Sequence, residues 1–173
     1  MSEVISGGVG DHLTWAWGRQ AIRADLQNTL GVLSRMVKAN HCDDWEYVAL
    51  RAWWMTVDAF FRAHLHREST VLAPALSAAG AAVPAAAVES SNHVGRLLHA
   101  LKASMANAAT REELQLAQHR VQALQRATLA HFAAGEGDLM TIAIATLSDA
   151  ELEGLARRAL KARGVQWWEV AQM

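Results

Sequence analysis

The sequence predicts an all-α protein, an up-down-up-down four-helix bundle with a short fifth helix at its C-terminal end. Apolar side chains recur at three- and four-residue steps over nearly the whole chain, which is the period of a buried helical stripe. Only two prolines occur in 173 residues, and 52% of the residues are hydrophobic, many of them alanine and leucine. This composition favours long helices. The length is sufficient for a single domain with its own core.

The first two helices follow an N-terminal stretch, residues 1–10, that we expect to be a flexible leader. The first helix should run from Asp11 to Lys38, because its apolar residues repeat at helical spacing. A link over residues 39–43 contains asparagine and aspartate, which suit the start of a helix. The second helix, from Asp44 to Leu76, should be the longest element.

Three further helices are predicted from Pro84 to Ala106, from Arg111 to Thr146, and from Asp149 to a point before Gly164. Proline suits a first helical turn, where its missing N–H is not needed. The last two starts each follow a capping box, formed by Thr110 with Glu113 and by Ser148 with Glu151. Short links between long helices predict the alternating bundle over residues 11–147.

Residues 148–173 comprise the fifth helix and an apolar tail. Val165, Trp167, Trp168 and Val170 are too apolar to remain in water, so we expect the tail to fold back on the bundle or to bury in a partner subunit of a homodimer. The chain has seven tryptophans. Core packing with a dimer interface is one interpretation of them, and an aromatic-lined ligand pocket between the first two helices is the other.

Charge and hydropathy exclude several classes of partner. The formal net charge of −1 gives no electrostatic reason to expect nucleic acid. Cys42 is the only cysteine, so no internal disulfide can form, and a reducing compartment fits. The apolar run from Leu139 to Leu147 is too short to cross a bilayer, and no secretory signal is visible. We therefore expect a soluble cytoplasmic protein without nucleic-acid or membrane partners.

Polar residues inside the apolar helices point to a metal site. His64 and Glu68 lie four residues apart, so an imidazole and a carboxylate share one helix face. Apolar residues flank the pair on both sides, and polar groups in such a helix need a partner. Glu89 with His93 repeats this spacing in the third helix, and His131 stands in the fourth. Imidazole and carboxylate ligands on facing helices suit iron, manganese or zinc.

These residues give the chain a resemblance to the hemerythrin-like (HHE cation-binding) proteins over about residues 13–147. The resemblance is carried by His64-x3-Glu68 followed by a proline, by His93, and by His131-x4-Glu136. In that family a four-helix bundle holds a non-haem diiron centre, with terminal histidine ligands and two bridging carboxylates. The resemblance implies that His64, His93 and His131 are terminal ligands and that Glu68 and Glu136 are the bridges.

The chain departs from the family pattern in its first and third helices. A first-helix histidine is usual, but Arg19 and Gln20 occupy the expected position. His12 lies on the same face as Arg19, two turns away, and is a weaker ligand candidate. The third helix usually supplies a second histidine, and Glu89 is the weaker candidate there.

The third departure concerns the spacing in the fourth helix. Five helical residues turn through about 500°, so Glu136 would point roughly 140° away from His131 in a regular helix. A one-residue bulge would close this gap, and the glycines at 135 and 137 make local unwinding easier. Asp138, seven residues after His131, is the alternative carboxylate for a regular helix.

Two classes of function follow. The first is a non-haem iron protein, most simply with a diiron centre, that binds or activates dioxygen, nitric oxide or peroxide, or oxidises a small substrate. Manganese or zinc could occupy the same ligands. The second is a metal-poor descendant of the same fold that serves as a small-molecule pocket or a protein-interaction module. The missing first-helix histidine favours the second class.

Overall fold

The structure is a computed structural model that describes residues 10–39 and 42–161. Within these ranges, the side chains of residues 10–17, 134–136 and 160–161 are not described. The predicted leader up to residue 9 and the tail from residue 162 lie outside the described residues. The predicted all-α class is confirmed for the described part of the chain, where every regular element is a helix.

The helical elements form five rods, two of which contain a short π-helical segment. Their bounds lie within two residues of those predicted wherever both ends can be compared. Pro84 is a local difference, because its extended ψ of 129° makes it the N-cap residue and not part of the first turn. The prediction that the second helix is the longest element is wrong, since the rod over residues 111–146 is longer than the rod over residues 44–78. The elements are α1 (Gly10–Lys38), α2 (Asp44–Arg67), η1 (Glu68–Leu72), α3 (Ala73–Ala78), α4 (Ala85–Asn107), α5 (Arg111–Ala130), η2 (His131–Gly135), α6 (Glu136–Thr146) and α7 (Asp149–Lys161).

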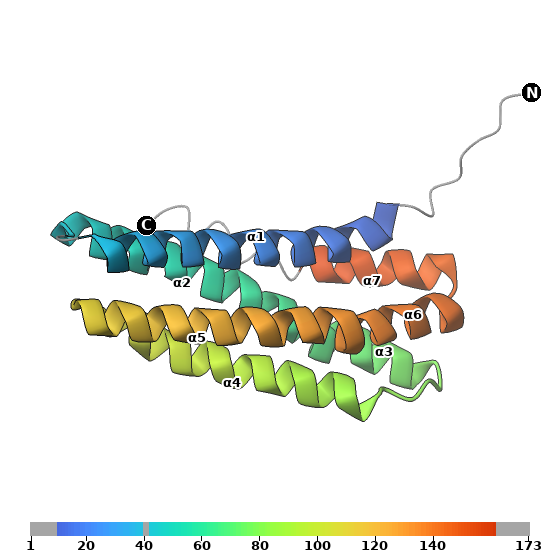
Figure 1. The fold of residues 1–173 in the computed structure, drawn as a ribbon. Coiled ribbons are helices and arrows are strands. Elements are labelled where there is room, and N and C mark those ends of the chain that lie inside the picture. Colours follow the sequence, from blue (N-terminus) through green and yellow to red (C-terminus); the bar gives the residue numbers. More distant parts are fainter. Residues whose placement is uncertain (1–9, 40–41, 162–173) are drawn as a thin grey trace, which may run out of the picture.

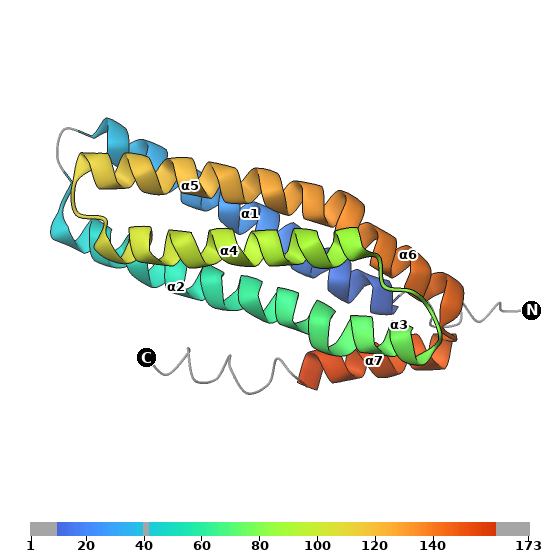
Figure 2. The ribbon, with the colours of Figure 1, turned by 90° about the horizontal axis from the view of Figure 1, so that it is seen from below.

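The four long rods pack around a common core. The helix α1 contacts α2 and α5, and α4 contacts the same two helices, so the four elements form a closed ring of neighbours. Figures 1 and 2 show the rods side by side, with the chain turning back at each short link. The helix α7 packs at one end, against α1 and η1. No helix within the described ranges has the length and apolar character needed to cross a membrane.

The core consists of two apolar clusters that follow one another along the bundle. The main cluster joins α1, α2, α4 and α5, and includes Phe61. The second joins η1, α3, α6 and α7, and includes Leu72. Between these two residues on the same rod lie His64 and Glu68, which are 1% and 3% exposed. A buried polar layer therefore separates the two clusters, and polar groups at such a place must find partners.

Both π-helical segments have local causes. Pro74, at the start of α3, has no backbone N–H to donate to the preceding turn. That preceding turn is η1, where the helix widens to the π-helical form. The Ser69 and Thr70 hydroxyls donate to the His66 carbonyl oxygen at 3.0 and 2.7 Å, so side chains stabilise the widened turn. Just after η2, a Cβ added at Gly137 in α6 would lie 3.3 Å from the Phe132 carbonyl oxygen of η2, so glycine suits this turn.

The two predicted capping boxes are present, and one makes a testable contribution to stability. Backbone N–H groups of Ala109 and Thr110 donate to the Glu113 carboxylate, each at 2.9 Å. These hydrogen bonds lower the pKa of Glu113 below its ordinary 4.5. A carboxyl with a depressed folded-state pKa stabilises the protein above its unfolded-state pKa, and this contribution is lost as the pH falls through the folded-state value.

We therefore expect Glu113→Gln to flatten the acid limb of the stability profile. Urea unfolding between about pH 6 and pH 3 would measure the free energy of unfolding of both proteins. Wild type should lose more stability on acidification than the variant. Glu112→Gln, which removes the neighbouring exposed carboxylate, is the control. Equal losses in wild type and Glu113→Gln would contradict the role of the box.

Candidate metal centre

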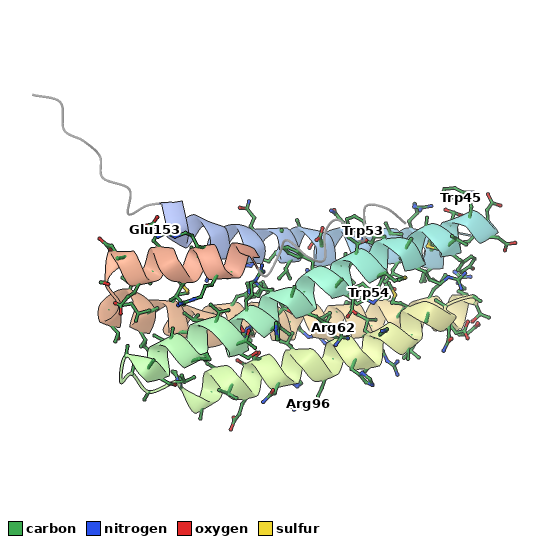
Figure 3. All side chains as sticks on the ribbon, turned by 180° about the vertical axis from the view of Figure 1, so that it is seen from behind. Trp45, Trp53, Trp54, Arg62, Arg96 and Glu153 are labelled. Carbon is green, nitrogen blue, oxygen red and sulfur yellow. The ribbon has the colours of Figure 1, made fainter. Side chains whose placement is uncertain are left out.

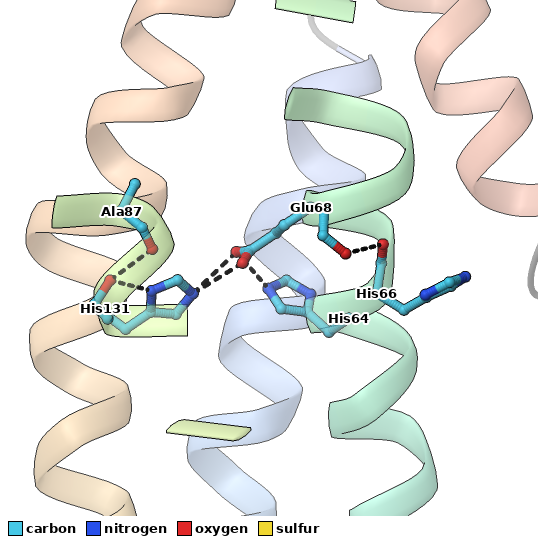
Figure 4. Close-up of polar contacts among 7 residues, drawn as sticks. His64, His66, Glu68, Ala87 and His131 are labelled. Carbon is cyan, nitrogen blue, oxygen red and sulfur yellow. Dashed lines mark hydrogen bonds and ion pairs between the residues drawn. The ribbon is translucent and has the colours of Figure 1, made fainter. Parts of the chain in front are cut away.

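Three buried side chains from two rods meet in the polar layer, and we call them the polar cluster: His64, Glu68 and His131. His131 Nε2 lies 3.1 and 3.0 Å from the two carboxylate oxygens of Glu68. His64 Nε2 lies 3.6 Å from Glu68 Oε1, on the other side of the carboxylate. Figure 4 shows both imidazoles turned toward the same carboxylate. All three side chains are at most 3% exposed.

Secondary structure places each member of the cluster. His64 lies in the last turn of α2, Glu68 is the first residue of η1, and His131 is the first residue of η2. Both π-helical segments thus begin at a cluster residue. Such segments are frequent at functional sites, since the extra residue re-aims the side chains around it. The bulge considered from the sequence between His131 and Glu136 is present, although the side chain of Glu136 is not described.

Ser90 determines which nitrogen of His131 carries a proton. The Ser90 hydroxyl donates to the Ala87 carbonyl oxygen at 3.0 Å, which uses its only proton. Its contact of 2.9 Å with His131 Nδ1 is then a hydrogen bond in which Nδ1–H donates to Ser90 Oγ. If the imidazole is neutral, Nε2 carries no proton, and its lone pair faces the Glu68 carboxylate.

A lone pair and a carboxylate at 3.0 Å repel each other unless positive charge lies between them. Two species can supply that charge: a proton shared between Nε2 and the carboxylate, or a metal ion bound by both. Histidine ligands of metals commonly donate their other ring N–H to an oxygen acceptor, which orients the ring. The contact from His131 to Ser90 has this form.

The surroundings of the cluster are apolar and closely packed. The Phe132 ring meets the His64 ring edge to face, with centroids 5.6 Å apart, and it is itself 2% exposed. The Arg23 guanidinium lies 5.7 Å from the centroid of the Phe132 ring. From α1, Gly18 approaches so closely that a Cβ there would lie 3.2 Å from His64 Nδ1. Glycine therefore allows α1 to pack directly over His64, which holds that ring in place.

The other predicted ligands are not gathered at this point. His93 and Glu89 are exposed on α4, whose buried face carries Ala87 and Val94 instead. Asp138, the alternative carboxylate, is also exposed. His12 and Glu136 belong to the residues whose side chains are not described. The structure thus brings together three of the predicted ligands and leaves three other candidates, His93, Glu89 and Asp138, on the surface.

Taken in pairs, the nitrogen and oxygen atoms of the cluster are of a type and spacing found between two ligands of one metal ion. Two ligand atoms, each about 2.1 Å from an ion and about 90–110° apart, are separated by about 3.0–3.4 Å. The nitrogen–oxygen separations in the cluster, 3.0 to 3.6 Å, are close to this range. As the side chains stand, however, no group of three or more His, Cys, Asp or Glu residues in the described part of the chain is arranged to hold an ion.

The described tryptophans have separate roles. Trp54 is buried in the main core cluster, as the core-packing interpretation predicts. Trp53 is half-buried, and its Nε1–H donates to Thr29 Oγ1 at 3.0 Å, which ties α2 to α1. Trp45 is 65% exposed. The side chains of the remaining four tryptophans lie outside the description.

Comparison with known proteins gives no relative from which a role could be transferred. No family model matches the chain, and no match was found among curated proteins or among solved structures.

Proposed function

We propose that this chain is a metal-binding bundle of hemerythrin type, in which His64, Glu68 and His131 bind non-haem iron. One observation carries the proposal: His131 Nε2 faces a fully buried carboxylate while its Nδ1–H is engaged by Ser90. Two imidazoles and one carboxylate are the ligand set of many non-haem iron centres, and this set leaves positions open for a small ligand. Iron held there would supply ligand binding and redox chemistry toward dioxygen, nitric oxide or peroxide.

The residues of the chain have distinct tasks under this proposal. Glu68 neutralises the cation, and the two histidines fix its position across two rods. Ser90 holds His131 in the tautomer whose Nε2 is free to bind. Phe132 excludes bulk water from the cluster, which strengthens the electrostatic interactions inside it. In the ring of four rods, the two that carry the cluster lie diagonally across the core from each other, so a metal bound between them would lie inside the bundle.

The described ligands suffice for one ion, and a second would need further donors. Glu136 is the candidate bridge, because η2 inserts the extra residue that the five-residue spacing from His131 requires. Metal analysis of protein purified without added metal should find iron, or manganese or zinc in its place, at one ion per chain or more. If the protein binds neither iron, manganese nor zinc when each is added, the proposal is wrong.

A metal-poor bundle is the second candidate, and a specific observation favours it. The first-helix histidine of the family is replaced at the cluster by the backbone of Gly18, and His93 is exposed. Under this reading the cluster is a protonated His131 paired with Glu68, and the protein is a small-molecule pocket or an interaction module. The metal analysis separates the two candidates directly.

Ser90→Ala should weaken metal binding without removing a ligand. The substitution deletes the acceptor of the His131 Nδ1–H, so the ring is no longer fixed in the binding tautomer. Loss of such outer partners typically costs about 10–100-fold in metal affinity. Competition with a chelator of known affinity would measure the dissociation constant. Ser91→Ala is the matched control, because Ser91 lines an outer groove with His66 and Arg96. Equal affinities of Ser90→Ala and wild type would contradict the assigned role.

A further inference from the structure

The outer face of α2 carries apolar side chains that do not pack in the core of the bundle. Four of the eight exposed large hydrophobic side chains in the described part of the chain belong to this helix, whereas the other four are divided among α4, α5 and α6. Singly exposed apolar residues are ordinary, but a contiguous set marks a surface that is covered by something. Figure 3 labels two of these four, Trp45 and Trp53, on α2.

Three of these four side chains, together with exposed alanines of the same face, form a continuous stripe, which we call the outer stripe; Trp53 lies to one side of it, toward α1. Its members recur at steps of one, three and four residues, so they share one face of the helix opposite to the core. Trp45, Val48 and Met55 are 65%, 60% and 67% exposed. No charged residue interrupts the face, since the acidic and basic residues of α2 fall to either side. The members are Trp45, Val48, Ala49, Ala52, Met55 and Ala59.

The chain itself offers an occupant of matching chemistry. Twelve residues follow Lys161, where α7 ends, and they include Val165, Trp167, Trp168 and Val170. The helix α7 already packs against η1, which continues the α2 rod, and against α1. In Figures 1 and 2, α7 starts at the end of the bundle where α3 and α6 lie and ends near its middle, directed toward the end where α2 starts. The C-terminal end of α7 is thus directed along the rod that carries the stripe.

The length of the tail is sufficient. The stripe extends over fourteen helical steps, about 21 Å from Trp45 to Ala59. Twelve residues reach about 18 Å as a helix and about 40 Å when extended. We propose that residues 162–173 of the same chain cover the outer stripe of α2, with Trp167 and Trp168 against its alanines and Met55. The interface continues the contact that α7 makes with η1.

Cross-linking in the full chain tests the proposal. In a Cys42→Ser background, Met55→Cys combined with Trp168→Cys should form an intramolecular disulfide on mild oxidation. Leu116→Cys combined with Trp168→Cys is the matched control, because Leu116 is similarly exposed, at 47%, but lies on α5. We expect the first pair to cross-link at least tenfold faster, at a rate independent of protein concentration. Mass spectrometry would identify the linked peptides.

Two outcomes would overturn the proposal. Equal rates for the two pairs would show that the tail does not reach the stripe. Cross-linking that gives only dimers, at a rate that rises with protein concentration, would show that a second copy covers it.

Deleting residues 162–173 gives an independent measurement. The melting temperature should fall by roughly 5 °C or more, and the exposed stripe should bind a hydrophobic dye, while sedimentation still gives a monomer as for wild type. An unchanged melting temperature would contradict the proposal, as would a wild-type dimer that the deletion converts to monomer.

Discussion

Adding ferrous iron to the metal-free protein should raise its melting temperature by about 10 °C. A ligand that binds only the folded state, at about a thousand times its dissociation constant, stabilises that state by about 4 kcal/mol. For a chain of this size, about 2–4 °C of melting temperature corresponds to each kcal/mol. Thermal unfolding followed by circular dichroism, with iron and then with excess chelator, would measure the shift on one sample.

Variants of the polar cluster should lose this shift, whereas variants of exposed histidines should keep it. For each protein the quantity compared is the difference between its melting temperatures with and without iron, so effects of a substitution on the bundle itself cancel. His64→Ala, Glu68→Ala and His131→Ala should each reduce the difference to near zero. His66→Ala is the control, since His66 is exposed and points away from the cluster in Figure 4.

His93→Ala tests two opposing expectations for His93, one from the family resemblance and one from the structure. The resemblance implies that His93 is a terminal ligand, yet the side chain is exposed on α4. We expect His93→Ala to retain the full shift. Loss of the shift in this variant would mean that α4 turns inward when metal binds. A wild-type protein without any shift on addition of iron, manganese or zinc would refute the metal proposal and leave the metal-poor candidate.

The helix boundaries were predictable because local signals agree with the fold. Thr110 and Ser148 each begin a capping box whose hydrogen bonds are present in the structure. The His64 and Glu68 pair was predictable for a similar reason, since an i,i+4 spacing in an apolar helix leaves few other orientations. These inferences need only the period of a regular helix.

The third helix shows where periodicity fails. Its segment is rich in alanine, which tolerates both core and surface, so the sequence does not say which of several faces is buried. The buried face carries Ala87, Val94 and Leu98, and this register turns His93 and Glu89 outward. Ser90 lies between Ala87 and Val94 and reaches the cluster. In the sequence, Ser90 is one hydroxyl among small residues near a buried stripe. This pattern does not identify it as a partner of His131 unless the facing helix is known.

Interhelix contacts account for the other residue that sequence reasoning missed. The family pattern predicts the first-helix ligand at Arg19 or Gln20, but the residue of α1 that packs against His64 is Gly18. A mid-helix glycine signals either a weak point or a close approach, and only the neighbouring rod decides between them. The π-helical turn at Glu68 is likewise hidden, because a period of 3.6 residues assumes that the helix stays regular.

The polar cluster should also be costly to the fold when no metal is bound. His131→Leu leaves the Glu68 carboxylate buried without its imidazole partner at 3.0 Å, and breaking a buried pair in this way costs about 3–5 kcal/mol. Replacing both residues by leucine removes the stranded charge together with its partner. Such double replacements are often neutral or stabilising. We therefore expect the double variant to recover most of the stability that the single variant loses.

Chemical unfolding in the presence of a chelator would give the four free energies of this double-mutant cycle. The exposed pair of Arg157 and Glu153, whose side chains are 66% and 55% exposed, is the control. Its coupling should be about 0.5 kcal/mol or less, because exposed ion pairs contribute little. A double variant much less stable than His131→Leu would make the cluster a structural element. The double variant could instead be as stable as metal-free wild type and unable to bind iron. In that case the buried charged residues would not be needed for stability, and metal binding would explain their place in the core.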